Sequence, residues 1–207
     1  RQTSGADMTR PIVVLGIFVA DTAYRAARLP RMGETVLGHG FALGPGGKGS
    51  NQAVGTTRLG AKASLVAVIG TDKLAGIATD LYAAEGVDTT HLAVSAVRPT
   101  GVGFIILNDA GENFIILDMG ANELLDAAAV DAAAARIAQS DVVMSVLEVP
   151  LQAVGRAMQL GREHDAITIL NPAPGRPLPD ALLADVDYLT PNESELRILL
   201  GLPPDDP

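Results

Sequence analysis

A glycine-rich segment, GPGGKGSN at residues 44–51, is the part of the sequence best suited to bind a ligand. Glycines let the backbone approach a ligand closely, and a helix that begins here offers free N–H groups with partial positive charge. Lys48 and Asn51 stand three residues apart, so both face the same side of the first helical turn and can hydrogen-bond hydroxyl groups. The segment predicts a loop that binds a polar small molecule.

Other interpretations of this loop have to be weighed against that one. A Walker A loop is excluded, because Ala42 replaces its first glycine and a glycine follows Lys48. The G-x-G-x-x-G pattern of dinucleotide-binding proteins is matched by Gly44, Gly46 and Gly49. Asp72 lies near the acidic position of that pattern, so an NAD-dependent oxidoreductase is one alternative, although residues 21–43 separate the glycines from the first strand. A tight turn with a solvated lysine is another.

The elements that must position this loop alternate between apolar runs and helical patterns, which predicts an α/β fold with a mostly parallel sheet flanked by helices. We expect strands at 12–19, 64–69, 141–147, 167–170 and 188–190. We expect helices at 50–59, 72–85, 124–139, 151–164 and 193–200. Asp21 and Glu148 each follow a predicted strand, and the carboxyl ends of parallel strands are where such sheets bind ligands.

Two segments do not fit the alternation of strands and helices. Residues 34–43 are strand-like, and residues 101–117 predict a hairpin around Asn108-Asp109-Ala110-Gly111. We expect both to form a small β-strand lid over the ligand edge of the sheet. Residues 1–11 are expected to be disordered or a cloning remnant, which leaves 12–207 as one α/β domain.

Composition narrows the classes of function. The formal net charge of −9 argues against nucleic-acid binding. The absence of Cys excludes disulfides and thiolate chemistry and fits a cytoplasmic protein. The longest apolar run, residues 11–20, is too short to span a membrane. His39, His91 and His164 have no metal-ligand spacing.

Four ordered motifs resemble those of the ribokinase-like (PfkB) carbohydrate kinases. They are VLGIFVAD (14–21), GGKGSNQAVGTTRLGAKASLVAVIGTD (46–72), NPAP (171–174) and TPNESE (190–195). The resemblance extends over the chain from about Ile12 and implies a Rossmann-type sheet with a lid. It also implies phosphoryl transfer from ATP to the hydroxyl of ribose or a related sugar.

The resemblance also implies the roles of individual residues. Asp21, Gly47, Lys48, Asn51 and Glu148 would bind the sugar. In the N-x-x-E motif, Asn192 would bind nucleotide phosphate and Glu195 would act on Mg²⁺ through water. The same two residues have the spacing of a helix capping box, which needs no metal. A monovalent cation and a homodimer formed through the lid are further family expectations.

Two departures from the family pattern matter. Val19 stands where ribokinases typically carry Asn, which weakens the case for ribose as the acceptor. The family's Gly-Ala-Gly-Asp loop, whose Asp is the catalytic base, has no match in these residues. We therefore expect a chain truncated at the C-terminus and inactive alone, either a fragment of a kinase or a non-catalytic sugar-binding remnant.

Overall fold

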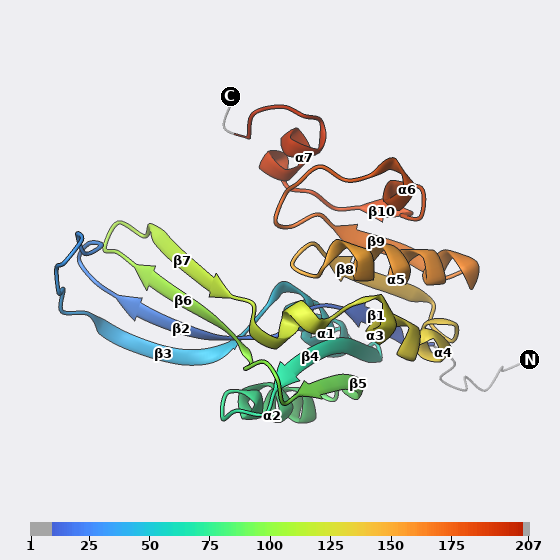
Figure 1. Cartoon of the computed structure of the whole chain (residues 1–207), viewed down its shortest axis with the longest axis horizontal. Helices are drawn as coiled ribbons and strands as arrows, with labels where there is room; N and C mark the ends of the chain where they lie inside the picture. Colours follow the sequence, from blue (N-terminus) through green and yellow to red (C-terminus); the bar gives the residue numbers. More distant parts are fainter. Residues whose placement is uncertain (1–9, 205–207) are drawn as a thin grey trace, which may run out of the picture.

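Six parallel strands form the main sheet within residues 10–204, the part of the chain that the computed structural model describes (Figure 1). Their order across the sheet is β10-β9-β8-β1-β4-β5. The strands are β1 Ile12–Leu15, β4 Ala63–Gly70, β5 Asp88–Ser95, β8 Val142–Val146, β9 Ile167–Asn171 and β10 Tyr188–Leu189. Every pairing between them is parallel, so their carboxyl ends share one edge.

Helices cover both faces of this sheet because its central strands are apolar on both sides. Helices α1 (Lys48–Arg58) and α2 (Ala75–Glu85) pack on one face, where Val14 and Leu65 meet Tyr82. The opposite face carries helices α3 (Ala127–Ala132), α4 (Ala134–Ile137), α5 (Leu151–Glu163) and α6 (Asp180–Leu183). The last helix, α7 (Glu193–Leu199), buries no residue completely.

A second sheet of four strands extends from the carboxyl edge of the main sheet (Figure 1). Its order is β3-β2-β6-β7, with β2 Val19–Arg25, β3 His39–Gly46, β6 Gly101–Leu107 and β7 Asn113–Asp118. The pairs β2–β3 and β6–β7 are antiparallel, whereas β2 and β6 are parallel. We call these four strands the lid sheet.

The structure confirms the fold class and corrects several predicted elements. The strand predicted at 12–19 is divided, because the chain leaves the main sheet after Leu15 and enters the lid sheet at Val19. The helix predicted at 124–139 is broken into a 3₁₀ turn (Gly120–Leu124), α3 and α4. Edge strand β5 and helix α6 were not predicted.

Two other boundaries also differ from the predictions. Helix α2 begins at Ala75 instead of residue 72, since the Asp72 side chain bonds to backbone outside the helix. Strand β3 covers 39–46, whereas a lid strand was predicted at 34–43. The expectation for residues 1–11 lies mostly outside the described residues, which begin at Arg10. Among the described helices, none combines the length and the apolarity needed to cross a membrane.

Candidate sugar-binding site

The glycine loop is held against the segment that joins the two sheets. Gly47 precedes helix α1 with φ = 95°, a conformation that disfavours any side chain, and a Cβ atom there would collide with the carbonyl oxygen of Ile17. A Cβ atom at Gly49 would likewise collide with Gly16. The backbone N–H of Ser50 donates to the Ile17 carbonyl at 3.2 Å. The glycines are therefore needed for this close contact, and the loop enters α1 from lid strand β3.

Asp21 occupies a narrow place in the lid sheet. It lies inside β2, opposite Gly44 of β3 and Gly103 of β6, and this corrects the expectation that it ends a strand of the main sheet. A Cβ atom at Gly46 would collide with Asp21 Oδ2, and one at Gly103 would collide with Asp21 Oδ1. Two glycines thus leave room for this carboxylate, each on a neighbouring strand.

The electrostatic surroundings of Asp21 favour its protonated form. Partial burial raises the pKa of the Asp21 carboxyl, and the nearby negative charge of Glu148 raises it further. Asp21 lies against Gly46, and Glu148 accepts from the backbone of Lys48 two residues further along, so both acidic groups lie at the glycine loop. A pair of close carboxylates is well suited to accept hydrogen bonds from the hydroxyl groups of a ligand.

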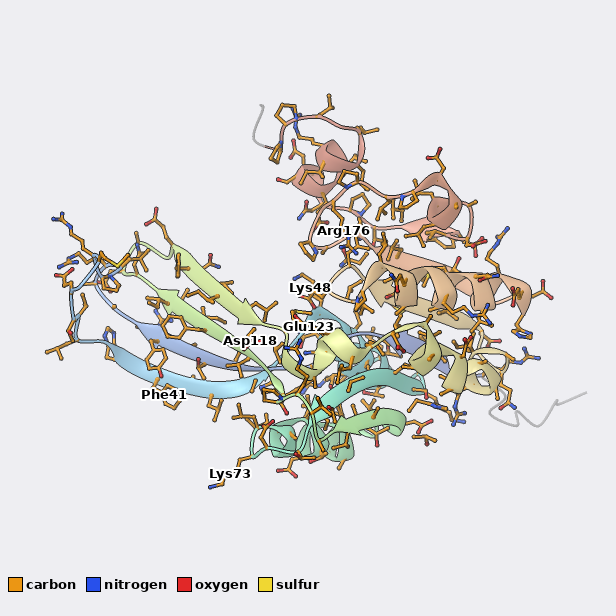
Figure 2. All side chains as sticks on the ribbon, in the orientation of Figure 1. Phe41, Lys48, Lys73, Asp118, Glu123 and Arg176 are labelled. Carbon is orange, nitrogen blue, oxygen red and sulfur yellow. The ribbon has the colours of Figure 1, made fainter. Side chains whose placement is uncertain are left out.

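Glu148 is bonded twice to Lys48. Its Oε2 accepts from the Lys48 backbone N–H at 2.9 Å, and its Oε1 accepts from Lys48 Nζ at 2.6 Å. The Glu148 side chain is 9% exposed, whereas that of Lys48 is 47% exposed. Figure 2 shows Lys48 at the junction of the main sheet and the lid sheet. The lysine therefore fixes Glu148 and the start of α1 together.

Asn51 lies one helical turn further along α1 and is exposed, with its backbone N–H bonded to the Gly47 carbonyl at 2.9 Å. Asp21, Gly47, Lys48 and Glu148 are thus brought together, with Asn51 on the adjoining turn. Val19 is 3% exposed and packs with Ile17 and other core residues. Val19 precedes Asp21 by two positions on β2, so the two side chains lie on the same face of this strand.

The junction of the two sheets depends on a residue that the sequence did not single out. Asn122 is fully buried, and its Oδ1 accepts from the Phe18 N–H at 3.3 Å. Its Nδ2 donates to the carbonyls of Phe18 and Met119, each at 2.8 Å. A second contact lies just before β6, where Asp72 Oδ2 accepts from the Thr100 N–H at 2.6 Å. Asp72 thus anchors the start of β6. No local sequence pattern predicts the contacts of Asn122 or of Asp72.

Asn192 and Glu195 form the capping box of α7. Asn192 Oδ1 accepts from the Glu195 N–H, and Glu195 Oε2 accepts from the Asn192 N–H, both at 2.8 Å. Residues 10–204 contain no group of three or more His, Asp or Glu side chains that could hold a metal ion. The capping box uses Glu195 Oε2 and not its Oε1 atom.

Taken together, the fold and the site define an α/β domain with a β lid, in which charged and polar side chains gather where the lid sheet meets the main sheet. The family model for the pfkB family carbohydrate kinases matches residues 9–207, and the chain belongs to this family. It is 40% identical over 195 residues to a ribokinase of Haemophilus influenzae and 33% identical to a deoxyribokinase of Salmonella typhimurium. In both cases the match covers 94% of this chain and 64% of the relative.

A solved structure of Arabidopsis thaliana ribokinase complexed with ribose and ATP has the same fold, with a TM-score of 0.83 and 28% sequence identity. The match covers 96% of this chain and 65% of that structure. The chain thus spans slightly less than two thirds of the length of these relatives. The structural likeness confirms the predicted fold class.

Proposed function

We propose that this chain carries the acceptor-sugar half of an ATP-dependent sugar kinase and binds ribose or a related sugar. Asp21 and Glu148 accept hydrogen bonds from the sugar hydroxyls, Lys48 and Asn51 donate to them, and Gly47 leaves room for the ring. The observation that carries this proposal is the fit of the Asp21 carboxylate between Gly46 and Gly103. Glycines on both neighbouring strands keep the carboxylate free of contacting side chains, as binding of a sugar requires.

The choice of sugar follows from Val19. The apolar side chain of Val19, two positions before Asp21 on β2, offers no hydrogen bond to a sugar hydroxyl. It therefore favours a sugar that lacks the hydroxyl group that would face it. Relatives of this chain include both ribokinases and deoxyribokinases. We therefore expect 2-deoxyribose to compete well with ribose for this site.

Asn192 and Glu195 are the residues of this chain proposed to act on the nucleotide. Asn192 would contact a phosphate of ATP, and Glu195 would orient water molecules bound to Mg²⁺, which would neutralise phosphate charge. A monovalent cation is a further expectation. Because the Gly-Ala-Gly-Asp loop has no match in these 207 residues, we propose that they bind sugar without transferring the phosphoryl group.

A cluster of aromatic side chains on the lid sheet favours a homodimer in the parent enzyme. Tyr24 lies 5.1 Å from Phe41 and 5.7 Å from Phe104 between ring centroids, and all three rings are exposed. An apolar surface of this kind is typical of protein interfaces. A cytoplasmic location agrees with the Cys-free composition and with the proposed use of ATP.

Calorimetric titration of the chain with ribose, 2-deoxyribose, fructose and NADH tests the proposal. We expect a pentose to bind and to raise the melting temperature, whereas NADH should do neither. Binding of NADH without binding of any sugar would favour the oxidoreductase alternative and contradict the proposal.

A further inference from the structure

Arg176 has two guanidinium nitrogens that lack acceptors. Its Nε and Nη2 atoms are buried, and neither has a hydrogen-bond partner within the described residues. These two nitrogens form one edge of the guanidinium fork, which matches two oxygens of a carboxylate or phosphate group. A buried cationic donor pair without an acceptor is unfavourable, so its retention calls for an anion that binds there.

The loop that carries Arg176 lies at the ligand edge of the main sheet. It follows Asn171, the last residue of β9, whose own Oδ1 atom is buried without a partner. Figure 2 shows Arg176 on the same edge of the sheet as Lys48. The unpaired donors and the unpaired acceptor thus occur where parallel strands end, which is where α/β sheets bind ligands.

The same loop is packed against the first turn of α7. A Cβ atom at Gly175 would lie 3.2 Å from Glu195 Cα and 2.9 Å from Ile198 Cδ1. The Oε2 atom of Glu195 already accepts from the Asn192 N–H and not from Arg176. Glu148 is likewise bonded to Lys48. Glu195 and Glu148 therefore each have a hydrogen-bond partner other than Arg176.

We propose that Arg176 binds the phosphate groups of the nucleotide, with its Nε–Nη2 edge donating to two phosphate oxygens. This inference rests on the proposed function and adds a binding residue to it. Phosphate is favoured as the acceptor because it offers two oxygens to the two N–H groups and carries a negative charge that neutralises the guanidinium. Arg176 is partly buried as a whole, and its long side chain has several rotatable bonds through which this edge would reach the phosphate oxygens.

Calorimetric titration with ATP, inorganic tripolyphosphate, inorganic phosphate and adenosine tests the assignment in the wild type and in Arg176→Gln. The variant should bind ATP and tripolyphosphate at least about tenfold more weakly, with adenosine affinity unchanged. Arg176→Lys keeps the charge but not the fork, so we expect an intermediate loss; it also decides the question if Arg176→Gln does not fold. Arg162→Gln is the matched control, because Arg162 is paired with Asp187 at 2.7 Å on the surface.

The melting temperature without ligand provides a second measurement. Removal of an unpaired buried charge should leave it unchanged or raise it, whereas a fall in Arg176→Gln would mean that the acceptor belongs to the protein and would overturn the proposal. Unchanged ATP affinity in that variant, or no ATP binding by the wild type, would also overturn it. So would inorganic phosphate binding as tightly as ATP. Ribose binding in the same preparations reports on the sugar site separately.

Discussion

Lys48 and Glu148 are joined by two hydrogen bonds across a separation of 100 residues, one from the Lys48 backbone at 2.9 Å and one from its Nζ at 2.6 Å. The pair connects the start of α1 with the second residue after β8. Because Glu148 is nearly buried, its carboxylate depends on this cation for charge compensation. Lys48 therefore has a structural role in addition to the sugar contact proposed for it.

Lys48→Ala should lower the free energy of unfolding by about 1–2 kcal/mol, since it leaves the nearly buried Glu148 without its cation, while solvent at the half-exposed Lys48 limits the loss. Sugar affinity should fall roughly tenfold, less than after loss of Asp21, because the backbone of the glycine loop remains. Urea unfolding and calorimetry measure the two effects. The double variant Lys48→Ala/Glu148→Gln should recover part of the stability, and no recovery would contradict the proposed coupling.

Gly103→Ala and Gly46→Ala should each reduce sugar affinity at least about tenfold, because the new Cβ atom would displace an oxygen of Asp21. Gly44→Ala is the matched control: Gly44 is paired with Asp21 on β3, but a Cβ atom there would have no neighbour within 4 Å. Equal sugar affinity in all three variants would show that the space around this carboxylate does not matter for binding.

Sugar binding should weaken as the pH falls, because the ionised form of Asp21 is the better acceptor. Burial and Glu148 raise the pKa of Asp21 above its ordinary value of 3.8, so the loss should begin at a higher pH than for a free aspartate. A raised pKa also means that ionised Asp21 destabilises the folded state above that pKa and has no such effect below 3.8. Calorimetry between pH 4 and pH 8 checks the expected fall in affinity; constant affinity would exclude this role.

Asn192→Ala should destabilise the chain by about 1 kcal/mol, because the N-cap bond of α7 is lost. Asn192→Ser keeps a capping oxygen and should retain most of that stability. If Asn192 also contacts nucleotide phosphate, the Ser variant should still lose ATP affinity. Urea unfolding and ATP titration of both variants separate capping from binding, and full ATP affinity in the Ser variant would restrict Asn192 to capping.

Local pattern was enough to predict most strands of the main sheet, but not all of its strands and helices. The apolar runs at 64–69 and 141–147 correspond to β4 and β8, which are buried on both faces. Edge strand β5 escaped prediction because none of its residues is buried and its first four are polar, which leaves no long apolar run. The division at Gly16 escaped it as well, since one apolar run supplies both the end of β1 and the start of β2.

The candidate site was predictable as far as its residues carry recognisable motifs. Asp21, Lys48 and Glu148 carry such motifs and lie at the glycine loop, but the structure was needed to show that Lys48 holds Glu148. Gly103 and Asn122 act through contacts with residues 82 and 104 positions away, respectively. Such contacts depend on how the lid sheet packs against the main sheet, and no local sequence pattern predicts that packing.

Calorimetric titration of wild type and Asp21→Asn with ribose and 2-deoxyribose is the most direct test of the proposed sugar site. We predict that the wild type binds a pentose and that the variant shows no detectable binding. The melting temperature of the variant at pH 7 should be unchanged or higher, because the destabilising charge is gone. A folded Asp21→Asn variant with wild-type sugar affinity would contradict the account.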